Sequence, residues 1–215
     1  MQTVTLVPAR PISRELGGRL CLAFVNSVLW RRSGNGRDLL TDFPAFVRYL
    51  VSSGGLDPAS GDALREAAAT RATKSVAAFE RAIELREVLY RLFSAAAAGE
   101  QPATADLNFL NATFARGMGA LAVRAGPAGY ELGWDRTRPG LDWPIWEIAV
   151  SAAAVLSSDD LAVLKQCPGQ SCGWLFIDES RAGNRRWCSS QLCGNRDRVR
   201  RHYQRTHDSR TAESS

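Results

Sequence analysis

Residues 167–193 read CPGQSCGWLFIDESRAGNRRWCSSQLC, and their four cysteines follow the pattern C-x4-C-x15-C-x4-C. Each short pair can close a tight turn around a metal ion, and the loop between the pairs lets the two turns face each other tetrahedrally. The pattern predicts one structural Zn²⁺ bound by Cys167, Cys172, Cys188 and Cys193. Two disulfides, an iron site and unliganded thiols are the alternatives. The disulfides are disfavoured in the cytoplasm, where we expect this protein.

A basic helix is predicted to begin after Cys188, with Ser189 or Ser190 as its cap and Cys193 in its first turn. It should run to Thr206, since this stretch holds no proline. At about 100° per residue its side chains separate into two faces. The face expected to pack within the finger carries Leu192, Val199 and Tyr203. The opposite face carries Arg198, Arg201 and Arg205.

The net charge of +5 comes from this C-terminal part. Residues 165–215 contain 10 Lys and Arg against 5 Asp and Glu, whereas the two classes cancel over residues 1–164. Such a local basic cluster is expected where nucleic-acid phosphates bind. The candidate contacts are Arg185, Arg186, Arg196, Arg198, Arg200, Arg201 and Arg205. A solvated helix surface in an arginine-rich chain and an acidic protein partner are the alternatives.

The rest of the chain predicts a mainly α-helical N-terminal domain with a small β-hairpin. The composition, 45% hydrophobic and 23% charged, is that of a globular protein, and no apolar run is long enough to span a membrane. Apolar spacing predicts helices at 12–30, 43–53, 62–98, 103–116 and 143–164, the last with a break at Ser157-Ser158, and a hairpin at 121–134. Asp142 is the expected N-cap of the last helix, which should carry the zinc finger on its end.

Three motifs of the C-terminal part resemble the CGNR zinc-finger family. They are Cys193-Gly194-Asn195-Arg196, Arg186-Trp187-Cys188-Ser189 and Cys172-Gly173-Trp174-Leu175-Phe176. The resemblance implies that the four cysteines bind zinc. It also implies that Asn195 and Arg196 serve the structure of the finger or its contact with nucleic acid. Asn195 could hydrogen-bond a loop carbonyl or a ligand sulfur, and Arg196 could stack on an aromatic ring such as that of Trp187 or reach a phosphate.

The N-terminal part is similar to the ABATE domain, which commonly precedes this finger and is proposed to be a stress-induced transcription regulator. Residues 17–28 (GGRLCLAFVNSV) and 83–87 (IELRE) carry this similarity. The expected arrangement is an ABATE-like helical domain at 1–163, a CGNR zinc finger at 164–208 and a disordered tail at 209–215.

These observations predict a zinc-binding transcriptional regulator whose partner is nucleic acid, DNA more than RNA, and whose helical domain regulates it or forms a homodimer. One alternative is a sensor of an unknown small-molecule effector, with a pocket at Trp134, Trp143 and Trp146. Another is an adaptor whose finger binds RNA or an acidic protein. An enzyme is not expected, because there is no nucleophile elbow or P-loop, and four thiolates leave zinc no open position for water.

Overall fold

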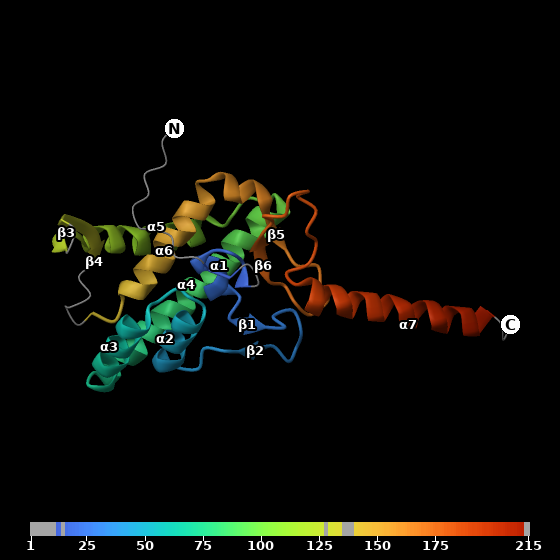
Figure 1. Cartoon of the computed structure of the whole chain (residues 1–215), viewed down its shortest axis with the longest axis horizontal. Helices are drawn as coiled ribbons and strands as arrows, with labels where there is room; N and C mark the ends of the chain where they lie inside the picture. The colour runs from blue at the N-terminus through green and yellow to red at the C-terminus, as the bar shows by residue number, and fades with distance from the viewer. Residues whose placement is uncertain (1–11, 14–15, 127–128, 135–139, 213–215) are drawn as a thin grey trace.

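The computed structural model describes residues 12–13, 16–126, 129–134 and 140–212 (Figure 1). The α-helices there are α1 (Leu20–Val25), α2 (Phe43–Ser52), α3 (Pro58–Ala69), α4 (Ala72–Ala98), α5 (Thr104–Gly119), α6 (Trp143–Leu156) and α7 (Asn195–Ala212). The strands form three antiparallel pairs: β1 (Val28–Leu29) with β2 (Arg37–Asp38), β3 (Leu121–Gly126) with β4 (Gly129–Trp134), and β5 (Leu164–Gln166) with β6 (Leu175–Ile177). The predicted mainly α fold with a small β-hairpin is confirmed.

The hydrophobic core surrounds α4, which packs against α1, α2, α3, α5, α6 and β5. Leu85, Leu89 and Phe93 of α4 are fully buried. The short helix α1 lies against α4 and α6 and buries every side chain from Cys21 to Val25. The hairpin β3–β4 and the free end of α7 lie at opposite ends of the molecule (Figure 1).

The first helix is shorter than predicted, since the expected span 12–30 is reduced to α1. Gly17 and Gly18 have φ angles of 114° and 84°, which are incompatible with a right-handed helix. At the other end, the buried side chain of Asn26 bonds to strand β6, and the chain turns into β1. The apolar residues of this segment are therefore buried as predicted. The helix is shorter because the backbone at Gly17 and Gly18 is not helical and because Asn26 bonds to β6.

The predicted helix 62–98 is two helices, which are separated at Thr70 and Arg71. The start of α3 was also missed: Asp57 caps it by accepting a hydrogen bond from the Ser60 amide at 2.8 Å. Conversely, the side chain of Asp142 does not cap α6. Its carboxylate binds the Arg81 guanidinium of α4 at 2.7 Å instead, so that ion pairing replaced the expected cap.

The predicted break in the last helix is confirmed, because α6 ends at Leu156 with Ser157 as its C-cap. The connection to the finger differs from the prediction, because no α-helix continues from there to the first metal cysteine. After α6 the chain forms a 3-10 turn, Asp159–Val163, and then strand β5. Leu164, Leu175 and Ile177 of the β5–β6 hairpin belong to the main core. The finger is therefore attached by a hairpin that packs into the body. At its other end, α7 continues to Ala212, into the expected disordered tail.

Candidate metal centre and nucleic-acid interface

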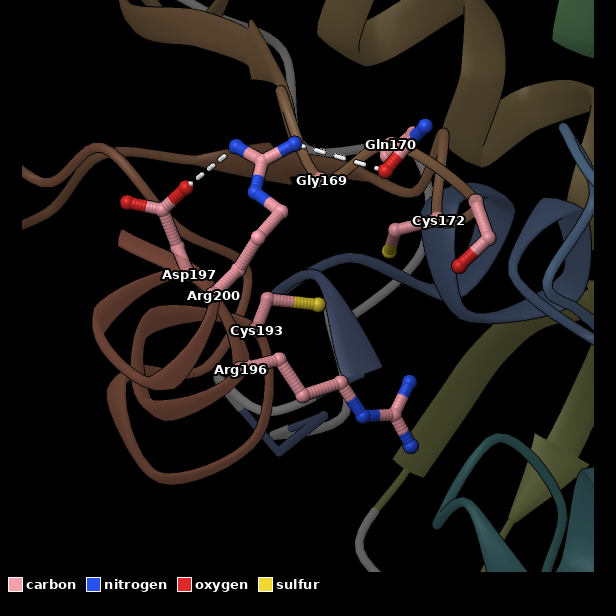
Figure 2. Close-up of a pocket in the computed structure, with 8 residues that line it drawn as sticks. Gly169, Gln170, Cys172, Cys193, Arg196, Asp197 and Arg200 are labelled. Atoms are coloured by element: carbon pink, nitrogen blue, oxygen red, sulfur yellow. Dashed lines mark hydrogen bonds and ion pairs between the residues drawn. The ribbon is translucent and has the colours of Figure 1, made fainter. Parts of the chain in front are cut away.

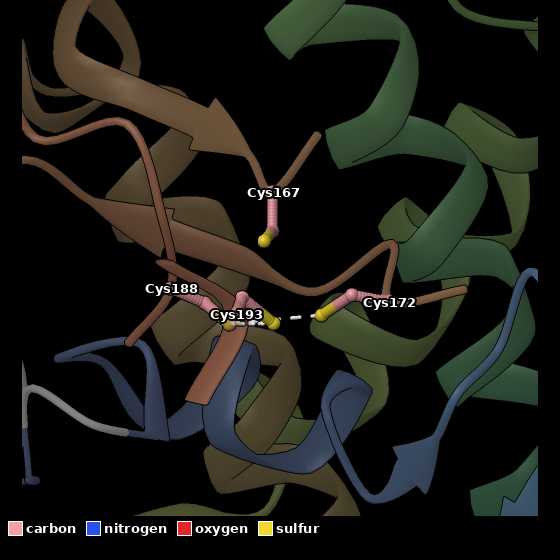
Figure 3. Close-up of side chains that lie close together, drawn as sticks. All are labelled: Cys167, Cys172, Cys188 and Cys193. Carbon is pink, nitrogen blue, oxygen red and sulfur yellow. Dashed lines mark hydrogen bonds between the residues drawn. The ribbon is translucent and has the colours of Figure 1, made fainter. Parts of the chain in front are cut away.

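Four sulfur atoms converge at the base of α7 (Figure 3). The Sγ atoms of Cys167, Cys172, Cys188 and Cys193 all lie within 4.8 Å of one another. Cys188 Sγ is 3.6 Å from both Cys172 Sγ and Cys193 Sγ. Tetrahedral zinc with Zn–S bonds of about 2.3 Å places its sulfurs about 3.8 Å apart, whereas a disulfide needs about 2.05 Å. The donor set and its spacing therefore fit one tetrahedral metal ion.

Local hydrogen bonds shape the two turns that present these sulfurs. Cys167 follows β5, and its amide donates to the Trp174 carbonyl at 2.7 Å; the Cys172 amide donates to the Gly169 carbonyl at 2.9 Å. In the second turn, the Ser189 hydroxyl accepts from the Leu192 amide at 3.2 Å and begins a π-helical turn, Ser190–Gly194, that leads into α7. The metal site therefore sits at the start of α7.

Aromatic side chains enclose the cluster. Phe176 is fully buried against the cysteines, and Trp174 and Trp187 pack around them. A Cβ atom on Gly194 would lie 3.2 Å from the Trp187 ring, which explains why the residue after Cys193 is glycine. The four cysteines and these aromatic side chains form a small core of their own, separate from the main core. The four sulfur atoms lie at its centre.

Asp178 fixes the loop between the cysteine pairs, and sequence reasoning missed it. Its buried carboxylate accepts hydrogen bonds from Lys165 Nζ at 2.5 Å, Ser180 N at 3.0 Å and Arg185 N at 2.9 Å. Burial raises the pKa of this carboxyl group, but the hydrogen bonds from Lys165 and Ser180 outweigh it and hold the pKa well below its usual range. Nothing in the sequence separated Asp178 from an ordinary turn residue.

A second missed residue, Asn26, joins the finger to the body. Its side chain is buried, donates to the Leu175 carbonyl at 2.8 Å and accepts from the Leu175 amide at 2.9 Å. It therefore pairs with β6 as a neighbouring strand would. Trp174 Nε1 also donates to the Val28 carbonyl at 2.9 Å. These three bonds join the finger to residues that follow α1.

The four thiols affect one another's acidity. Hydrogen bonds from Cys172 and Cys188 lower the pKa of the Cys167 thiol. Hydrogen bonding with Cys167 raises the pKa of Cys172 to about 12 and raises that of Cys188. Burial raises the pKa of Cys193. Thiolates at this spacing need a positive counter-charge, so a metal dication must displace protons to bind, and its affinity falls as the pH falls.

Comparison with known families matches both parts of the chain. Residues 18–159 match the ABATE family, described as "Putative stress-induced transcription regulator". The chain belongs to the ABATE family. Residues 164–206 match the CGNR zinc finger, and this range contains all four clustered cysteines. No curated protein matches the chain. The family and the sulfur geometry together identify one structural Zn²⁺ as the cofactor, and neither family is described as an enzyme.

The predicted packing face of α7 is wrong. Leu192, Val199 and Tyr203 are 60%, 47% and 65% exposed, because α7 leaves the body at its first turn and projects away from it (Figure 1). The finger's apolar side chains pack around the cysteines or in the main core instead. Among the described residues, none of the long helices of the ABATE domain covers α7.

Most of the predicted arginines lie on this exposed helix. Arg196, Arg198, Arg200, Arg201 and Arg205 are all exposed. Two of them also pair with Asp197, at 2.7 Å for Arg200 and 2.9 Å for Arg201.

The two remaining arginines lie in the loop before Cys188. Arg186 is exposed and stacks on Trp187 at 5.3 Å. Arg185 is half-buried, lies over the Phe176 ring at 4.4 Å and donates to the carbonyls of Trp187 and Cys188. The structure therefore shows Arg185 supporting the metal turn, and a phosphate contact by this residue stays a prediction.

Cys193 and Arg196 of the CGNR motif line a small pocket of about 160 Å³ between α7 and the loop 169–171 (Figure 2). Arg200 reaches the Gln170 side chain across it, whereas Arg196 points away from Arg200. Arg196 lies 5.8 Å over the ring of Trp30, in the ABATE domain, and not over Trp187. Asn195 is exposed at the junction with α7, and its support of the zinc ligands stays a prediction.

The three tryptophans proposed to line an effector pocket belong to the main core. Trp134 and Trp143 are buried, and Trp146 packs against the same core. Trp134 Nε1 donates to the Gly117 carbonyl at 2.7 Å. These contacts show that the three tryptophans contribute to the main core. Their role in binding an effector stays a prediction. No helix among the described residues has the length and hydropathy needed to cross a membrane.

Proposed function

We propose that this protein is a zinc-dependent transcriptional regulator that binds nucleic acid, DNA in preference to RNA, through α7. The observation that carries the proposal is a projecting helix whose arginines at 196, 198, 200, 201 and 205 are all exposed. A helix that projects alone gains no stability from packing, whereas its charge suits a polyanion. The major groove of DNA is wide enough to admit an α-helix.

The metal site explains how α7 can be held in place while most of its surface remains accessible to nucleic acid. Cys188 lies just before the π-helical turn that leads into α7 and Cys193 lies within it, so zinc fixes the helix at one end and leaves the remainder accessible. A single basic helix binds weakly as a monomer, and two copies on adjacent half-sites bind far more tightly. We therefore propose that the ABATE domain acts as the regulatory or dimerising part.

The test uses the full-length, zinc-loaded protein, because the finger shares its hairpin with the main core. Binding to duplex DNA and to RNA is measured over a range of salt concentrations. The slope of log affinity against log salt falls by about 0.9 for each duplex phosphate contact that is removed. The test variant is Arg198→Ala, Arg201→Ala and Arg205→Ala combined.

The matched control removes three positive charges from the helices α2, α4 and α5 of the body. It combines Arg48→Ala, Lys74→Ala and Arg116→Ala, all at exposed positions. We expect the test variant to lose affinity and salt dependence and the control to keep both. Equal behaviour of the two variants would show that α7 does not bind phosphates.

One observation favours a second function, that of an adaptor. The exposed Leu192 of the π-helical turn continues with Val199 and Tyr203 of α7 as an apolar stripe that an acidic protein could cover. The distinguishing experiment is a pull-down with and without nuclease. A partner that survives nuclease and requires Tyr203 would support the adaptor.

A further inference from the structure

We propose that Trp30 of the ABATE domain stacks on an unpaired base of the nucleic acid, beside a phosphate held by Arg196. This proposal rests on the proposed function and assigns it a second contact, outside the zinc finger. The ligand is a single-stranded nucleotide segment, since bases of a closed duplex already stack on one another.

Trp30 lies at the surface next to the basic helix. Its side chain is 39% exposed, although tryptophan is usually a core residue. Its ring faces the guanidinium of Arg196 at 5.8 Å. Aromatic rings beside arginines are the usual platform on which proteins stack the bases of single strands.

The backbone at Trp30 is strained in a way that presents this side chain. Trp30 has a φ of 52°, and among the described residues it is the only non-glycine with a positive φ. A bulky residue rarely adopts this backbone conformation, so the surroundings must impose it. The Ser33 amide and hydroxyl both donate to the Trp30 carbonyl at 2.9 Å and close the turn.

Its neighbours hold the segment on both domains. Arg31 pairs with Glu87 at 2.5 Å and lies 4.1 Å over the Tyr90 ring, both on α4. The Arg32 amide donates to the carbonyl of Ser171, in the first metal turn, at 3.1 Å. Arg31 therefore holds the segment to α4, and the Arg32 backbone holds it to the first metal turn. The side chain of Trp30 stays exposed between the two domains.

The pocket beside Arg196 supplies the place for a phosphate. It is lined by the loop 169–171, by Cys172 and Cys193, and by Arg196, Asp197 and Arg200 of α7 (Figure 2). The carboxylate of Asp197 is already paired with Arg200 and Arg201. Arg196 belongs both to this pocket and to the contact with Trp30. A nucleotide can therefore place its phosphate at Arg196 and its base against Trp30.

The experiment separates base stacking from phosphate binding. Full-length, zinc-loaded protein is titrated with labelled oligothymidine of about 12 nucleotides and with an abasic strand of the same length, which keeps the phosphates but has no bases. The variants are Trp30→Ala, Trp30→Phe and, as an exposed aromatic control on β4 at the far end of the molecule, Tyr130→Ala. Zinc content and melting temperature are measured for each.

We expect Trp30→Ala to weaken oligothymidine binding about 5- to 100-fold, the range found when a stacking aromatic is removed, and to leave abasic binding unchanged. Trp30→Phe should retain most of the affinity and lose part of the tryptophan fluorescence quenching seen on binding. Tyr130→Ala should match the wild type.

Unchanged oligothymidine binding by Trp30→Ala, or equal loss on both strands, overturns the stacking role while the proposed function stands. Absence of binding by the wild type to the oligothymidine, the abasic strand and duplex DNA overturns the proposed function as well. If Trp30→Ala loses zinc or stability, Trp30→Phe and its fluorescence decide the question.

Discussion

Helices α4 and α7 are 27 and 18 residues long, and they are stabilised by different means. In α4, nine side chains are buried, and the helix contacts most other elements of the body. In α7, every described side chain after Asp197 is exposed, and the zinc site holds one end. The contrast shows that packing stabilises the body, whereas metal binding and a few ion pairs hold the helix that faces solvent.

Removing zinc should have the largest effect and should affect the two helices differently. Structural zinc contributes about 10–16 kcal/mol in small zinc modules, and a solitary helix of this length is marginal in water. We expect chelation, or Cys193→Ser, to abolish the protection of α7 amides from hydrogen exchange while α4 stays protected. Cys21→Ala, which alters the remaining cysteine in the main core, should keep one zinc per chain. If the α7 amides stayed protected without zinc, the conclusion that metal binding stabilises α7 would be wrong.

Leu89→Ala tests whether side-chain packing stabilises the body. Leu89 is fully buried in α4, so its truncation should lower the free energy of unfolding by about 2–5 kcal/mol through lost burial and a cavity. Urea denaturation measures this loss. At low denaturant the zinc content should not change, and a loss of zinc there would mean that the two regions are not separate.

Asn26→Ala should weaken the attachment of the finger to the body. Three backbone groups lose their partner: the Leu175 amide, the Leu175 carbonyl and the Leu16 carbonyl. Since each buried group left unpaired costs about 1–3 kcal/mol, we expect a total loss of about 3 kcal/mol and faster hydrogen exchange in β6. Asn111→Ala, at an exposed position of α5, is the control. An unaltered β6 would show that core packing alone holds the hairpin.

Asp178→Asn should remove an acid-sensitive contribution to the finger. The pKa of Asp178 is lowered in the folded protein, so its contribution is complete above the unfolded value of about 3.9 and is lost as the pH falls below it. The variant should be about 2 kcal/mol less stable at neutral pH, because Lys165 loses its charged partner. With zinc saturating, the deficit should shrink below about pH 4, and a constant deficit would indicate a purely steric effect.

Tyr203→Ala should have the smallest effect on stability. The side chain is 65% exposed, and substitutions at such sites usually change the free energy of unfolding by less than about 0.5 kcal/mol. Thermal denaturation of the zinc-loaded protein measures the change. A larger loss would mean that α7 has a packing partner in solution.

The metal site could be predicted from the sequence because four cysteines at fixed spacing leave few arrangements for a tetrahedral ion. The body helices followed from apolar periodicity, although Gly17 and Gly18 shortened the first one. The packing face of α7 was wrong because periodicity shows that Leu192, Val199 and Tyr203 share a side and not that anything covers them. Asn26, Trp30 and Asp178 escaped prediction because their roles depend on residues distant in sequence.

Because α7 is attached only at one end, a small rotation at its base gives a large displacement at its far end. At 1.5 Å per residue its 18 residues extend about 27 Å from the zinc site. A rotation of about 10° at the base therefore displaces the far end by about 5 Å, which is comparable with the rise of a helical turn. Small adjustments where the Trp30 segment meets the first metal turn are thus amplified along the helix, and the arginines farthest from the zinc move most.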